Sequence, residues 1–112
     1  MAADRPWRHT RVSAGDAGGE LIYGGRAFLG GIVCSHLEGS EVTFTVYDDA
    51  EATGETPTGP VVLDLVVGSI GQRSVLVGES PLRLDNGIHV KSSDAETTTT
   101  YTVIWAPRSV NE

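Results

Sequence analysis

The sequence predicts an all-β protein: an antiparallel β-sandwich or jelly roll of about seven or eight strands with an extended N-terminal arm. Apolar and polar residues alternate with the period of two that a half-buried strand requires, most clearly at residues 42–47. Two Gly-Gly pairs, at 24–25 and 30–31, oppose helix at about 1 kcal/mol per glycine. No stretch has the helical period, so the strands are expected to pair antiparallel, without crossover helices.

Residues 41–50, EVTFTVYDDA, contain the clearest predicted strand. Val42, Phe44 and Val46 alternate with two threonines and a tyrosine, residue types that suit a pleated, half-buried surface. Asp48-Asp49 then ends the strand, because short polar side chains that bond their own backbone favour turns.

Residues 1–19 are predicted to be a flexible arm and linker, and residues 20–112 the β-sandwich domain. Pro6 opposes regular structure in the arm, and residues 13–19, SAGDAGG, are small and flexible. Trp7 is the exception, because an exposed indole leaves a large apolar surface in water. We expect it to be buried, either against its own domain or in a neighbouring molecule.

Further strands are predicted at residues 21–23, 27–36, 61–67, 74–77, 82–84, 88–90 and 97–105. In the second of these, Ile32 and Cys34 share the core face. Asn86-Gly87 stands between two short strands and predicts a hairpin, because these residues accept the positive φ of hairpin turns. His89 is expected to point outward from that hairpin.

The predicted strand at residues 61–67, VVLDLVV, is apolar on both faces except at Asp64. Such a strand indicates burial between layers or between subunits. Val62 and Val66 are therefore candidate contacts in a homo-oligomer, for which we expect a trimer.

Composition excludes several classes of protein. A formal net charge of −7 disfavours nucleic-acid binding, which requires a basic face. Cys34 is the single cysteine, so no internal disulfide is expected. The chain has neither an apolar run of membrane-spanning length nor an apolar leader, so we expect a protein made in the cytoplasm that does not contact membranes.

No catalytic, cofactor-binding or metal site is expected, and hence no enzymatic activity. His9, His36 and His89 are not spaced as metal ligands, and the Gly-Gly pairs do not lie between a strand and a helix as a phosphate loop does. The loop at residues 48–60 holds four carboxylates, but their spacing is not that of a calcium loop. A solvated acidic loop is the simpler interpretation, and cation binding remains the alternative.

Charge is distributed unevenly along the chain. Residues 1–12 hold three arginines and one aspartate, a formal charge of +2, and the remainder carries −9. A basic arm on an acidic body suits attachment to an acidic neighbour, including another copy. The candidate attachment residues are Arg5, Pro6, Trp7, Arg8 and Arg11.

Residues 43–55, TFTVYDDAEATGE, then 81–90, PLRLDNGIHV, and the terminal YTVIW together resemble small β-sandwich structural proteins of tailed-bacteriophage virions. That family includes capsid decoration or cement proteins and head-fibre subunits. The resemblance covers the chain from about residue 31 onward and leaves out the arm.

The resemblance implies a structural protein on the capsid exterior that stabilises the capsid by binding the major capsid protein at subunit junctions, often as a trimer. A tail or head-to-tail connector component is one alternative. A carbohydrate-binding β-sandwich module is another, although it would need exposed aromatic residues on a flat face or in a cleft.

Overall fold

The computed structural model describes residues 7–15, 17–77, 80–94, 99–109 and 111. These residues contain nine strands and no helix. The strands are β1 (Arg8–Ser13), β2 (Glu20–Tyr23), β3 (Ala27–Ser35), β4 (Val42–Tyr47), β5 (Val61–Val67), β6 (Gln72–Leu76), β7 (Leu82–Leu84), β8 (Ile88–Ser92) and β9 (Thr100–Pro107).

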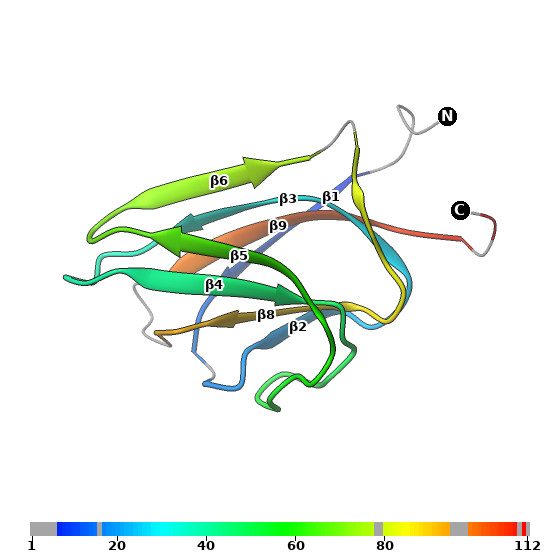
Figure 1. The fold of residues 1–112 in the computed structure, drawn as a ribbon, viewed down its shortest axis with the longest axis horizontal. Coiled ribbons are helices and arrows are strands. Elements are labelled where there is room, and N and C mark those ends of the chain that lie inside the picture. Colours follow the sequence, from blue (N-terminus) through cyan, green and yellow to red (C-terminus); the bar gives the residue numbers. More distant parts are fainter. Residues whose placement is uncertain (1–6, 16, 78–79, 95–98, 110, 112) are drawn as a thin grey trace.

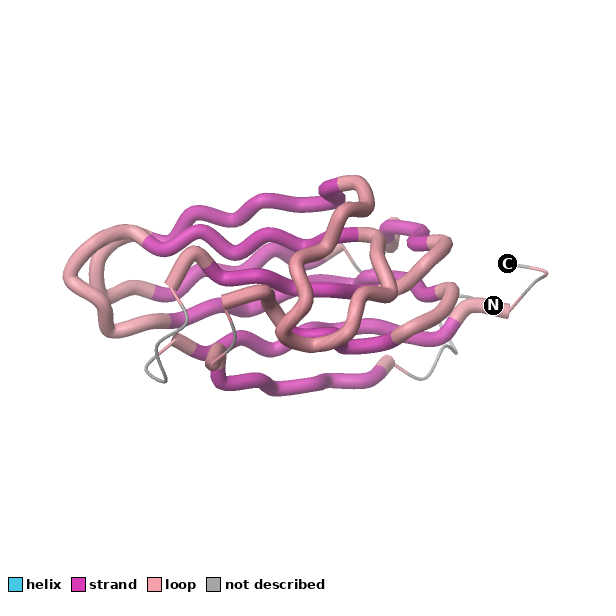
Figure 2. The backbone as a smooth tube through the Cα atoms, turned by 90° about the horizontal axis from the view of Figure 1, so that it is seen from below, coloured by secondary structure: helices cyan, strands magenta, loops and turns pink. Residues whose placement is uncertain are grey.

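The strands form two facing antiparallel sheets (Figure 1). Sheet A has the order β1-β9-β3-β6, with β7 also paired to β3, and sheet B has the order β2-β8-β4-β5. The strands run along the long axis of a body measuring 44 × 26 × 19 Å, and loops gather at both ends (Figure 2). The predicted antiparallel β-sandwich is confirmed.

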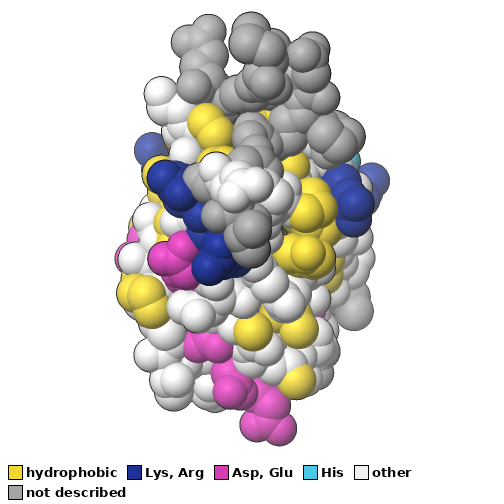
Figure 3. Space-filling view, turned by 90° about the vertical axis from the view of Figure 1, so that its right-hand side faces the viewer, with side chains coloured by type: hydrophobic (Ala, Val, Ile, Leu, Met, Phe, Trp, Pro, Cys, Tyr) yellow, Lys and Arg dark blue, Asp and Glu magenta, His cyan; other side chains and the backbone are white. Residues whose placement is uncertain are grey.

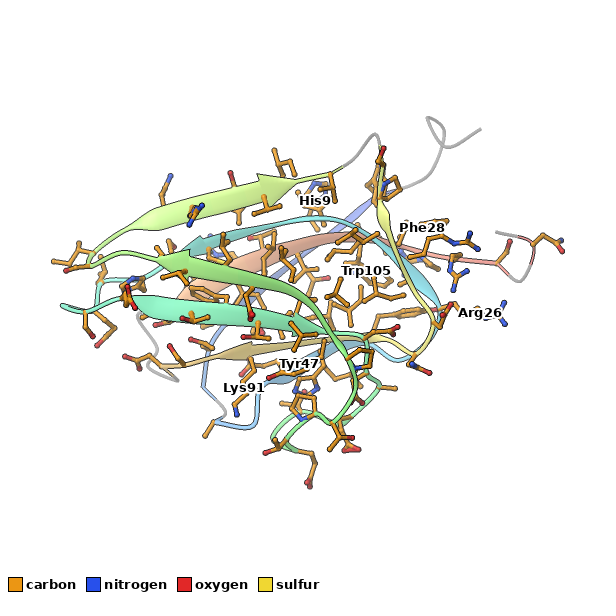
Figure 4. The ribbon with its side chains drawn as sticks, in the orientation of Figure 1. His9, Arg26, Phe28, Tyr47, Lys91 and Trp105 are labelled. Atoms are coloured by element: carbon orange, nitrogen blue, oxygen red, sulfur yellow. The ribbon has the colours of Figure 1, made fainter. Side chains whose placement is uncertain are left out.

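The inward faces of the two sheets pack against each other as the alternation predicts. Phe44 from sheet B meets the edge of Tyr101 from sheet A, with ring centroids 6.0 Å apart. Tyr23 stacks on Trp105 at 4.6 Å, and the ring of Trp105 lies between the sheets (Figure 4). Glu20 is buried among these apolar groups, and its carboxylate accepts a hydrogen bond from the Tyr101 hydroxyl.

β1 was not predicted. Residues 8–13, expected to belong to a flexible arm, pair along their whole length with β9 at the edge of sheet A. Val12 packs against the core, and the Trp105 indole donates a hydrogen bond to the Thr10 hydroxyl at 3.0 Å. The segment was missed because an edge strand is only partly covered: His9 and Arg11 point outward, and Arg8 is exposed although its register position faces inward, so no apolar alternation marks the strand.

The predicted hairpin around Asn86-Gly87 is wrong. β7 pairs with β3 in sheet A, whereas β8 pairs with β2 and β4 in sheet B, so the turn crosses between sheets. Asn86 does not adopt positive φ; among the described non-glycine residues only Ile70 does. The turn is held by the Asp48 carboxylate, which accepts hydrogen bonds from the N–H groups of residues 85–87.

The pairing of β1 makes a prediction about truncation. Deleting residues 1–12 should lower the free energy of unfolding by about 2 kcal/mol or more, because Val12 loses its packing and the Trp105 N–H loses its acceptor. Deleting residues 1–6 removes no part of β1, so the free energy of unfolding should change by less than about 0.5 kcal/mol. Urea unfolding measures both, and equal midpoints for the two truncations would contradict the role of β1.

Candidate assembly surface

The outer face of sheet A has no acidic residue in its strand rows. The register aligns side chains from four strands into rows across the sheet. From β1 to β6 the rows are His9, Ile104, Gly31 and Leu76; Arg11, Thr102, Val33 and Ser74; and Ser13, Thr100, Ser35 and Gln72. A surface without carboxylates is notable in a chain whose net charge is −7.

Apolar groups concentrate in the first of these rows. The Leu76 side chain is 65% exposed, and Val33 in the next row is 38% exposed. A shallow hollow of about 280 Å³ lies between Leu76 and the ring of Trp7, with Ile104 and His9 also lining it. Large exposed apolar groups around a hollow are typical of a contact surface.

Trp7 folds back onto its own domain, which is one of the two positions expected for it. Its ring lies on the backbone of Gly30, where a Cβ would come within 2.9 Å of the indole Cζ3. The indole is only half-buried and forms one wall of the hollow. The absence of a side chain at Gly30 therefore lets the Trp7 ring pack directly on the backbone.

The candidate attachment residues do not lie on one face. Arg11 points outward from sheet A, whereas Arg8 occupies an inward register position opposite Trp105 and places its guanidinium 5.2 Å from the centre of that ring. Arg5 and Pro6 lie outside the described residues. Attachment through this segment stays a prediction.

The strand at residues 61–67 is not buried between two layers of its own domain, and burial between subunits, the other alternative, stays a prediction. This strand, β5, is an edge strand of sheet B, and only its inward side is covered. Val66 points outward and is 41% exposed, whereas Val62, beside a bulge in the β4–β5 register, packs partly against the core. Val66 therefore stays available as an oligomer contact, and Val62 contributes to folding.

The acidic loop at residues 48–60 is built around the Asp49 carboxylate. Asp49 accepts hydrogen bonds from the backbone N–H groups of Gly59 at 2.6 Å, Thr58 at 2.8 Å and Glu51 at 2.8 Å. The Gly59 bond is the largest cause that lowers the pKa of Asp49; the other two bonds and the charge of His89 also lower it, while burial opposes them. Two carboxylates of this loop, Asp48 and Asp49, therefore organise the backbone.

His89 was expected to point into solvent but is fully buried. It stands on the outer face of sheet B, where Nδ1 lies 2.9 Å from the carbonyl oxygen of Glu51 and Nε2 lies 2.9 Å from that of Gly18. The imidazole thus ties both the acidic loop and the segment before β2 to the sheet. This burial depends on how two loops pack over the sheet, and the periodicity of a strand gives no information about loop packing.

Among the described residues, no group of three or more His, Cys, Asp or Glu side chains could hold a metal ion. No helix of the described part is long and apolar enough to span a membrane. Cys34 is fully buried in the core, as its alternation predicts, and burial raises the pKa of its thiol to about 12.

Trp7 and Arg11 were predicted to be attachment residues, but the surface that they border was not predicted. The available signal was strand alternation, which places Val33 and Ile104 on the faces opposite Cys34 and Trp105. What that signal lacked was register, because only the pairing of β9, β3 and β6 aligns them with Leu76.

Neither protein-family models nor curated proteins match this sequence. Among solved structures, the chain is similar to a protein from a study titled "Bacillus endospore appendages form a novel family of disulfide-linked pili", with a TM-score of 0.51 and 17% identity over 97% of this chain and 95% of that one. The coat protein of Tobacco streak virus aligns with a TM-score of 0.39 and 13% identity over 98% of this chain and 90% of that one. The first likeness shows a shared β-rich fold.

The hydrogen bonds of Asp49 predict a pH-dependent contribution to stability. A carboxyl whose pKa is lowered in the folded state stabilises the fold above its ordinary value of 3.8, and this stabilisation is lost as the pH falls through the lower folded value. Asp49→Asn should therefore reduce the urea midpoint at pH 6 and reduce it less at pH 3. Glu55→Gln, in the same loop but exposed, should have little effect at either pH. An Asp49→Asn deficit that is as large at pH 3 as at pH 6 would contradict this.

The close contact between the Trp7 ring and Gly30 predicts that a larger residue at position 30 will change the tryptophan fluorescence. Gly30→Ala should displace the indole, because the added methyl group approaches it to 2.9 Å, and tryptophan emission should shift to longer wavelength as the ring enters water. In a Trp7→Phe background the same substitution should leave the emission of the buried Trp105 unchanged. A shift that persists in that background would show that Trp7 is not its source.

Proposed function

We propose that this chain is a non-enzymatic structural subunit of a virion, which decorates the exterior of a tailed-phage capsid and binds the major capsid protein at subunit junctions through the outer face of sheet A. The observation that supports the proposal is the carboxylate-free, partly apolar face that this acidic chain presents. The sequence resemblance and the β-sandwich fold are consistent with it.

The chemistry of this face suits a protein contact. Interface centres are depleted of charged residues and enriched in aromatic ones, and here Trp7 borders a hollow beside Leu76. Completing the burial of Trp7 would contribute up to a few kcal/mol, whereas an exposed Arg11–carboxylate pair would add about 0–1 kcal/mol. Affinity should thus depend more on Trp7 than on Arg11, and only the arginine contribution should weaken with salt.

The polar clusters of the molecule also support a structural role. Asp49 and His89 direct their polar atoms at backbone groups of the acidic loop and of Gly18, and Asp48 binds the turn between β7 and β8 that crosses between the sheets. Such bonds stabilise a rigid body, which a protein that reinforces a capsid needs. We further propose that the subunit acts as a homo-oligomer, a trimer being the form that suits threefold positions of a capsid.

A filament subunit is the second candidate, because the similar appendage protein belongs to a family of disulfide-linked pili. In this chain Cys34 is fully buried and burial raises the pKa of its thiol to about 12, so it does not favour disulfide linkage between subunits. The capsid proposal therefore takes precedence.

The proposal predicts which face of the sandwich binds. Leu76→Glu should weaken cosedimentation with capsids assembled without this protein by at least about tenfold, because a carboxylate is introduced beside the hollow and must be desolvated on binding. The matched control is Thr45→Glu, which introduces the same charge on the outer face of sheet B.

Binding by Thr45→Glu should equal that of the unmodified protein, and both variants should keep their unfolding midpoints. If Leu76→Glu binds capsids as tightly as the control, the outer face of sheet A is not the contact surface. If the unmodified protein does not bind such capsids, the capsid proposal itself fails.

A further inference from the structure

His89 is a fully buried histidine, and both of its ring nitrogens face carbonyl oxygens. Nδ1 lies 2.9 Å from the carbonyl oxygen of Glu51, and Nε2 lies 2.9 Å from that of Gly18. A carbonyl oxygen only accepts hydrogen bonds, so each nitrogen needs a proton to form its bond. A neutral imidazole has one N–H, and only the imidazolium has two. The geometry therefore corresponds to a charged ring.

A neutral ring at this position would leave one of the two contacts unfavourable. Its unprotonated nitrogen would face a carbonyl oxygen at 2.9 Å, with no solvent to supply another partner. The segment before β2 passes close to the ring, because a Cβ at Gly19, where φ is 97°, would lie 2.6 Å from Nε2. Relief of the repulsion therefore requires one of the two carbonyl groups to move away from the ring.

His36, the other buried histidine, has the bonding of a neutral ring. Its Nδ1 accepts a hydrogen bond from the N–H of Glu38 at 3.0 Å, and its Nε2 lies 3.2 Å from the carbonyl oxygen of Val67. One proton, on Nε2, satisfies both contacts. The two buried histidines thus require different numbers of ring protons.

The acidic loop supplies negative charge to His89. The Asp49 carboxylate accepts a hydrogen bond from the N–H of Glu51 at 2.8 Å, so it orients the residue whose carbonyl faces Nδ1. The Gly59 N–H is the largest cause that lowers the pKa of Asp49, and the attraction of a charged His89 adds to it. Figure 3 shows Asp and Glu side chains at its lower end, the side on which Figure 1 places this loop. Hydrogen bonds and a nearby carboxylate offset the cost of burying a cation.

Three further titratable groups lie on the strands around His89. Tyr47, on β4, meets the ring edge-on with ring centres 6.4 Å apart. Lys91 is two residues further along β8, on the same outer face of sheet B (Figure 4). Glu20, on β2, points to the inner face, where it accepts the hydrogen bond of the Tyr101 hydroxyl. Of these three groups, Lys91 opposes a positive charge on His89.

The acidic loop contacts the segment around the start of β2 in three ways. Besides the bridge made by His89, the N–H of Gly54 donates to the carbonyl of Gly19 at 2.9 Å, and the hydroxyl of Thr53 accepts from the N–H of Leu21 at 2.9 Å. Of these three contacts, only the bridge of His89 depends on a proton that a side chain can release near neutral pH. Loss of that proton therefore weakens the attachment of the loop.

We propose that His89 is a doubly protonated clamp, and that release of one proton loosens the acidic loop from sheet B in a pH-sensitive switch. Because the folded state holds this proton, the stabilisation is present below about pH 6.5, where a free histidine is protonated. It is lost as the pH rises until the folded protein also releases the proton. The switch lies on sheet B, away from the proposed capsid contact on sheet A.

The protons on the ring of His89 can be observed directly. In protein labelled with ¹⁵N at histidine, NMR at pH 7.5 should show two protonated ring nitrogens for His89 and one for His36. The exposed His9 should be mostly neutral at this pH. Replacing each histidine in turn by glutamine assigns the signals. The decisive spectrum is that of the unmodified protein, so the result does not depend on whether His89→Gln folds.

Hydrogen exchange tests the switch. As His89 releases its proton, the protection factor of the Gly54 N–H should fall at least about tenfold, because one contact of the loop is lost. The N–H of Asp48, which donates to Pro60 at the base of the same loop, should keep its protection. In His89→Gln, Gly54 should be weakly protected at every pH. The control His9→Gln, on the edge strand of sheet A, should behave as the unmodified protein.

Any of three results would overturn the proposal. His89 could carry a single ring proton at pH 7.5, which would make it a neutral tautomer. It could keep both protons up to pH 10, in which case it is a fixed clamp and no switch. Finally, Gly54 could keep its protection when His89 loses a proton, or show the same pH dependence in His89→Gln as in the unmodified protein.

Discussion

The backbone of this protein crosses repeatedly between its two sheets, and every crossing must satisfy polar groups that no strand ladder reaches. At one end the acceptors are side chains of the loop after β4. Asp48 holds residues 85–87, where the chain passes from sheet A to sheet B, and Asp49 closes the acidic loop. His89 joins that loop to Gly18, so a single polar cluster holds three segments that are distant in sequence. The crossing from sheet A to sheet B and the loops that cover His89 depend on this arrangement.

Local sequence pattern predicted much of the fold, because burial on one face of a strand leaves a period of two. Residues 42–47 and 61–67 were predicted with the observed bounds. The pattern failed where structure depends on distant partners. Asn86-Gly87 has the composition of a hairpin turn, but β7 finds its partner in β3, and the carboxylate of Asp48 replaces the local turn geometry. β1 was missed because an edge strand with three exposed charged or titratable side chains resembles a solvated arm.

The candidate surfaces were predictable only in part, for a related reason. The burial of Trp7 was predictable, because an exposed indole is unfavourable. Its position against Gly30 was not, because that position depends on a close approach of the side chain to a distant part of the backbone. The row from His9 to Leu76 exists only after four strands are placed in register. Ile70 gave no signal at all, because nothing in the sequence marks an isoleucine for positive φ.

The place of β9 in sheet A has a consequence for biosynthesis. β9 is the last described strand in the sequence, yet it lies between β1 and β3 and is the strand to which β1 pairs. A chain is synthesised from its N-terminus, so β1 leaves the ribosome before its partner has been made. Until β9 is synthesised, β1 and β3 expose unpaired edges that other nascent chains can reach. The order of strands in the sheet thus delays the completion of sheet A until every described strand has been translated.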